Sequence, residues 1–148
     1  MLIRTLAIVF GALLLLAVAT GAMPALTDGL GHPPAPTRGY DDLLYIFTGV
    51  WALGAGLMSH SASLLCFRLS GAVYAAGGAL GVVAGTGCLD GGFLVNGFRP
   101  FDDIEFPQRL FASTPHLAIG GIALSIGFWL AAHAAAPAAA PRETPFSS

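Results

Sequence analysis

The chain has 148 residues, of which 55% are hydrophobic and only 9% are charged. A soluble domain carries about 25% charged residues, so this composition excludes an ordinary water-soluble fold and predicts a protein embedded in a membrane. The six basic residues are all arginines, scattered singly in a chain of net charge -2, which excludes a basic surface for nucleic acid.

Four long segments lack any charged residue, and each exceeds the ~20 residues that cross a bilayer. Backbone amides in lipid must pair within their own segment, so these segments should be helices. We predict an all-α membrane protein whose transmembrane domain spans residues 1–133, followed by a disordered Ala/Pro-rich tail at 134–148. The predicted helices lie near residues 4–23, 42–60, 65–86 and 111–133.

The first segment has a second interpretation, as a secretory signal peptide. Arg4 would be its basic start, and Ala17-Val18-Ala19 would be its cleavage site. An internal repeat favours a retained helix, because a removed signal has no reason to match a later span.

This repeat matches the first helix to the third and the second helix to the fourth. The segment Arg4–Phe10 corresponds to Arg68–Tyr74 at an offset of 64, and Tyr45–Gly49 corresponds to His116–Gly120 at an offset of 71. We therefore predict a four-helix bundle built from two tandem helical hairpins, related by a pseudo-two-fold axis along the membrane normal.

The orientation rests on weak charge signals, because the arginines divide evenly between the two predicted sides. The acidic residues collect on the side of Arg38, and Arg4 directly adjoins the first span. The first helix often dominates topology, so we expect a multi-pass protein of the bacterial inner membrane with both termini in the cytoplasm.

Tyr45 and His116 occupy matching positions of the repeat and form a candidate polar pair. Thr114 would cap the fourth helix and Pro115 would occupy its first position, which puts His116 near the exterior interface. The pair could hold a headgroup, a quinone or a proton. The alternative is a hydrogen bond that locks helix packing, with Tyr45 in the interfacial aromatic belt.

Small residues mark expected helix crossings. A row of glycines at intervals of four residues lies on the third helix, and single glycines open the even-numbered helices. Such residues let backbones approach closely in lipid. The predicted packing glycines are Gly49, Gly77, Gly81, Gly85 and Gly120.

Candidates for cofactor chemistry are few. His60 and His133 could hold a haem axially, but both lie at or beyond the membrane boundary, where a solvated histidine is the simpler interpretation. The acidic segment 101–106 could bind a divalent cation, but its spacing matches no EF-hand, and the alternative is a solvated loop whose phenylalanines enter the interface. We predict no cofactor, no metal and no catalytic residue, since the sequence contains none of the common catalytic motifs.

The motif His/Tyr-x3-Gly-x3-Leu opens both even-numbered helices. It is carried by His116, Gly120 and Leu124 and, with tyrosine in place of histidine, by Tyr45, Gly49 and Leu53. It resembles a family of small bacterial four-helix integral membrane proteins known as a domain of unknown function. The resemblance covers roughly residues 4–130 and implies fold and location, with no activity.

Two classes of function fit these patterns. The first is a non-catalytic accessory, scaffold or assembly subunit of a larger inner-membrane complex, with lipids and other membrane subunits as partners. The second is a small transporter or a lipid- or quinone-binding protein that uses the cleft between the repeats. The four uncharged segments favour the first class, because proton- or ion-coupled carriers usually place a charged residue within a membrane span.

Overall fold

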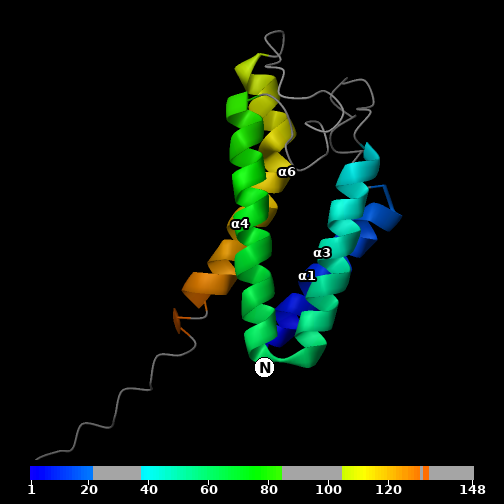
Figure 1. Ribbon diagram of the computed structural model, residues 1–148, viewed down its shortest axis with the longest axis vertical. Helices are drawn as coiled ribbons and strands as arrows, with labels where there is room; N and C mark the ends of the chain where they lie inside the picture. The colour runs from blue at the N-terminus through cyan, green and yellow to red at the C-terminus, as the bar shows by residue number, and fades with distance from the viewer. Residues whose placement is uncertain (22–37, 85–104, 131, 134–148) are drawn as a thin grey trace, which may run out of the picture.

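The computed structural model describes residues 1–21, 38–84, 105–130 and 132–133 (Figure 1). This part of the chain contains four α-helices and no strand. The predicted all-α class is therefore confirmed for the described residues. The helices are α1 (Leu2–Ala19), α3 (Arg38–Met58), α4 (His60–Ala84) and α6 (Phe106–Leu124), and α6 continues as the π-helix η1 (Ser125–Leu130).

The helices form two antiparallel pairs. In Figure 1, α1 lies along α3 and α4 lies along α6, and the chain returns between α3 and α4 at the end where it begins. The gap predicted between the helices near 42–60 and 65–86 is reduced to Ser59, since α3 ends at Met58 and α4 begins at His60. The Ser59 hydroxyl accepts a hydrogen bond from the Ala62 amide at 3.1 Å and so caps α4.

Contacts between the two pairs centre on α4. Besides packing against α6, its partner in the second pair, and against η1, it touches α3 and α1 of the first pair. At the end where the chain begins, Phe67 of α4 packs with Ile3 and Ala7 of α1 and with Ala123 of α6. All four are at most 1% exposed. This cluster holds the two helix pairs together.

Small side chains dominate the interior, and large apolar side chains cover the outside. Ala7, Ala52, Ala123 and Ser63 are fully buried, whereas the exposed side chains include large ones such as Phe47 and Trp129. A soluble protein would bury the large groups, because burial removes most apolar area from water. The distribution instead suits a bundle whose outer surface faces lipid.

Three segments are long and apolar enough to cross a membrane, judged by length and composition. They are Leu2–Ala19, His60–Val83 and Phe106–Leu130, and a shorter apolar helix covers Asp42–Met58. Leu14 of α1 faces the interior of the bundle, because it is 4% exposed and packs against Tyr45 and Tyr74.

Candidate functional site

Three aromatic side chains meet where the two helix pairs face each other. Tyr45 comes from α3, Tyr74 from α4 and His116 from α6; we call these three residues the Tyr–His cluster. The ring centroids of Tyr45 and Tyr74 are 5.9 Å apart with planes 9° from parallel. His116 lies 5.9 Å from Tyr45 and 5.7 Å from Tyr74. The predicted pairing of Tyr45 with His116 thus has a third member.

The cluster is polar although apolar side chains surround it. The Tyr74 hydroxyl donates a hydrogen bond of 3.1 Å to the hydroxyl oxygen of Thr48, and both residues are buried. The Nε2 atom of His116 is buried as well. Leu14 and Phe10 of α1 pack against the tyrosines. These groups can exchange hydrogen bonds with one another or with a ligand.

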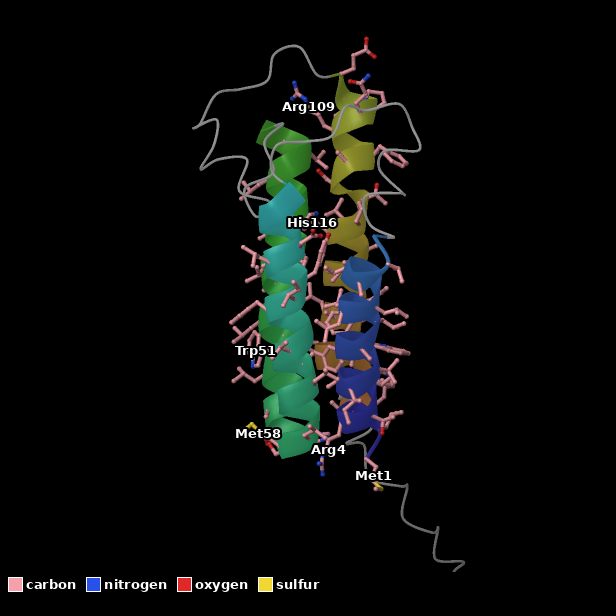
Figure 2. The ribbon with its side chains drawn as sticks, turned by 90° about the vertical axis from the view of Figure 1, so that its right-hand side faces the viewer. Met1, Arg4, Trp51, Met58, Arg109 and His116 are labelled. Atoms are coloured by element: carbon pink, nitrogen blue, oxygen red, sulfur yellow. The ribbon has the colours of Figure 1, made fainter. Side chains whose placement is uncertain are left out.

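His116 lies deeper than the sequence predicts. Because α6 begins at Phe106, His116 is about 15 Å along the helix at 1.5 Å per residue, near the middle of the span Phe106–Leu130. Figure 2 places it inside the bundle, well away from Arg109 at the upper end. The predicted position of His116 at the start of its helix is therefore wrong, and its location relative to a membrane interface stays a prediction.

The cap predicted for the fourth helix is also wrong. Thr114 lies inside α6, where its hydroxyl donates a hydrogen bond of 2.8 Å to the Leu110 carbonyl, and Pro115 is an internal proline. The helix instead starts after Glu105, with a proline in its first two positions. A proline suits that place because the first amides of a helix lack partners anyway.

Most of the predicted packing glycines lie at close crossings. A Cβ atom on Gly49 would lie 3.0 Å from the Gly11 carbonyl oxygen, and one on Gly120 would meet the backbone of Ala75. A Cβ on Gly81 would lie 2.5 Å from the Ser113 hydroxyl oxygen. Gly77 is buried, and Gly85 lies outside the described residues.

Sequence reasoning missed several contacts of the same kind. A Cβ on Gly11 would clash with α3, and Cβ atoms on Gly71 and Gly78 would clash with leucines of α6. A glycine on one side of a crossing leaves no mark in the sequence on the other side. Gly49 therefore gave no signal for its partner Gly11, which only the fold identifies.

The two arginines that open the matching segments of the repeat make specific contacts. Arg4 donates from Nε to the Gly56 carbonyl at 2.9 Å and from Nη2 to the Leu57 carbonyl at 2.8 Å. Arg68 donates from Nε to the Gly127 carbonyl at 2.9 Å. Arg4 and Arg68 are 64 positions apart, and Gly56 and Gly127 are 71 apart, so these contacts follow the two offsets of the repeat.

The histidines considered for haem lie at the surface. His60 and His133 are exposed, and the His133 ring packs 4.5 Å from Trp129, with Nδ1 2.8 Å from the Trp129 carbonyl. Among the described residues no group of three His, Cys, Asp or Glu side chains is placed to hold a metal. The acidic segment 101–104 lies outside the described part.

Comparison with known proteins adds no relative. No family model matches the chain, and no curated protein or solved structure is significantly similar to it. The resemblance to the four-helix family therefore rests on the His/Tyr-x3-Gly-x3-Leu motif of the even-numbered helices and stays a prediction.

Proposed function

We propose that the chain is an integral membrane protein made of two tandem helical hairpins, α1–α3 and α4–α6. Contacts that recur at the two offsets support the repeat. Besides the arginine contacts, the crossing of Gly11 with Gly49 corresponds to that of Ala75 with Gly120. The exposed apolar exterior supports membrane insertion, because the bilayer removes the penalty for displaying large apolar side chains.

Its function in this proposal is that of a non-catalytic accessory, scaffold or assembly subunit of a larger inner-membrane complex. The observation that carries it is the close packing of backbones inside each hairpin of the described bundle. Small side chains and near-contact of backbones fill the crossings at Gly11, Gly49 and Gly120. Because the helices of each pair pack this closely, the outer surface of the pair is the place where another protein would bind.

One face of α6 suits a partner helix. Four small residues are exposed and follow one another at intervals of four, three and four residues, which places them on one side of the helix. They are Thr114, Ala118, Gly121 and, at the start of η1, Ser125. We call them the α6 outer strip. A Cβ on Gly121 would meet nothing within 4 Å. The hydroxyls of Thr114 and Ser125 bond to carbonyls of their own helix, so a partner would meet a smooth, small-residue surface.

Native gels after mild detergent extraction test the subunit role, with mass spectrometry to identify partners. We expect an assembly larger than the chain, which Gly121→Leu dissociates because a bulky side chain blocks close approach. Ala12→Leu is the control, since it places the same leucine side chain at an exposed position of α1. A lone monomer or dimer in native extracts would contradict the subunit role.

The expected orientation, with both termini in the cytoplasm, needs an accessible probe. Cys66 cannot serve, because it is 1% exposed. Ser59→Cys, in a chain whose own cysteines are replaced by alanine, places a thiol at the exposed α3–α4 turn. A membrane-impermeant thiol reagent should label it only after the cells are opened. Labelling in intact cells would reverse the proposed orientation.

The Tyr–His cluster favours a second candidate, a protein that binds a lipid or quinone between the hairpins. Polar aromatic groups at the depth of His116 are costly in lipid and often mark function. A co-purifying lipophilic molecule that is lost in Tyr45→Phe/His116→Phe would support this candidate. A fully folded double variant that retains the same molecules would refute it.

A further inference from the structure

Arg4 and Arg68 each have hydrogen-bonding capacity beyond the contacts they make. A guanidinium carries five N–H donors. Arg4 directs two of them to the carbonyls of Gly56 and Leu57, and Arg68 directs one to Gly127. Both side chains are exposed, and their remaining donors have no hydrogen-bond partner among the described residues. The contacts to carbonyls orient each planar group.

The described charges at this end of the bundle are all basic. Arg4 lies there beside Met1, and Met58 marks the end of α3 (Figure 2). His60 at the start of α4 and His133 after η1 add two imidazole rings. The described carboxylates, Asp42 and Glu105, lie near the starts of α3 and α6, at the other end of the bundle.

Exposed apolar groups flank both arginines. Leu57, whose carbonyl accepts from Arg4, is 69% exposed, and the adjacent Met58 is 77% exposed. The Arg68 guanidinium lies 4.8 Å from the ring centroid of Phe128, which is 55% exposed. A cation next to exposed apolar surface matches the boundary between phosphate groups and acyl chains in a bilayer.

We infer that Arg4 and Arg68 each bind the phosphate of an anionic phospholipid, one at each hairpin. The planar fork of arginine fits two phosphate oxygens at once, and the adjacent apolar side chains contact the acyl chains. Net positive charge at this end favours an anionic lipid over a zwitterionic one. The inference rests on the membrane insertion proposed above. The competing role is structural, because a cation stabilises the carbonyls in the last turn of a helix without any ligand.

Lipid titration of the purified full-length chain in neutral detergent separates these roles. The thermal unfolding midpoint is followed while phosphatidylglycerol or phosphatidylcholine of the same acyl chains is added. The wild type should respond at lower concentrations of phosphatidylglycerol. Each of Arg4→Gln and Arg68→Gln should weaken that apparent affinity about fivefold, the effect of one basic residue near an anionic surface. Arg109→Gln, at the opposite end, should leave it unchanged.

Three results would overturn the inference: equal responses to the two lipids, an equal loss in Arg109→Gln, or the same stabilisation by inorganic phosphate alone. If the glutamine variants do not fold, native mass spectrometry of the wild type decides. Retention of both lipids in equal amounts from an equimolar mixture would then refute a headgroup site. These results leave membrane insertion intact, whereas failure of insertion appears separately as a chain absent from carbonate-washed membranes.

Discussion

Gly120 and Gly121 are neighbours on α6 with opposite surroundings, which makes them a sharp test of the packing. A Cβ atom on Gly120 would lie 2.8 Å from the Ala75 Cα and would also meet the Ala75 amide nitrogen. A Cβ on Gly121 would meet nothing within 4 Å. We therefore compare Gly120→Ala with Gly121→Ala, two changes that add the same methyl group to consecutive residues of one helix.

Two energies oppose each other at Gly120. Alanine is a better helix former than glycine by about 1 kcal/mol, and both variants gain a share of this. Overpacking a close contact costs about 1–3 kcal/mol, and the upper half applies here because the obstacle is backbone, which no rotamer change can move. Gly120→Ala should therefore lose about 1–2 kcal/mol of unfolding free energy. Gly121→Ala should gain about 0.5–1 kcal/mol.

Reversible unfolding by SDS in mixed micelles, followed by circular dichroism, measures both free energies. A neutral or stabilising Gly120→Ala would refute the α4–α6 crossing as described, since it would mean that the helices stand far enough apart for a methyl group. A loss of stability in Gly121→Ala would be equally informative. It would place that residue in a contact, within a second copy or another subunit, that persists in the detergent.

Further predictions follow from other contacts. Leu14→Ala should cost about 2–5 kcal/mol because Leu14 is buried, whereas Leu13→Ala, at a 59% exposed side chain, should change the SDS midpoint little because lipid or detergent refills the space. Tyr74→Phe removes the hydrogen bond to Thr48 and should cost about 0.6 kcal/mol, the average for membrane interiors; no change in a double-mutant cycle with Thr48→Val would deny that bond any energetic role. The purified protein should lack a Soret absorption band, and a band abolished by His60→Ala would revive the haem interpretation.

Helix number and type could be predicted because the uncharged segments leave no alternative in lipid, where each backbone amide must find its partner locally. The start of α6 could not. Thr114-Pro115 has the local chemistry of a helix start, yet the helix continues through it, as membrane helices tolerate internal proline when other groups satisfy the backbone. The true start at Phe106 has a weaker sequence signal, a proline next to Glu105.

Only part of the candidate site could be predicted from the sequence, namely the residues that match each other in the repeat. The repeat identified Tyr45 and His116 because they match each other at an offset of 71. Tyr74 matches Phe10, an apolar residue, so the same reasoning offered no reason to select it. Its place in the cluster depends on how the two hairpins lie against each other, and the spacing within each hairpin carries no information about that relation.

The proposed repeat also explains where polar groups concentrate. Positions at the crossing inside each hairpin carry small residues in both copies, as in Gly11 and Ala75 or Gly49 and Gly120, because close approach of α1 to α3 and of α4 to α6 imposes the same steric demand. Positions between the hairpins face unlike neighbours and are free to differ in chemistry, as Phe10 differs from Tyr74, although Tyr45 and His116 are polar aromatic groups in both copies. Polar side chains can occupy this second class without disturbing either hairpin, which is why Tyr74, Thr48 and His116 meet there.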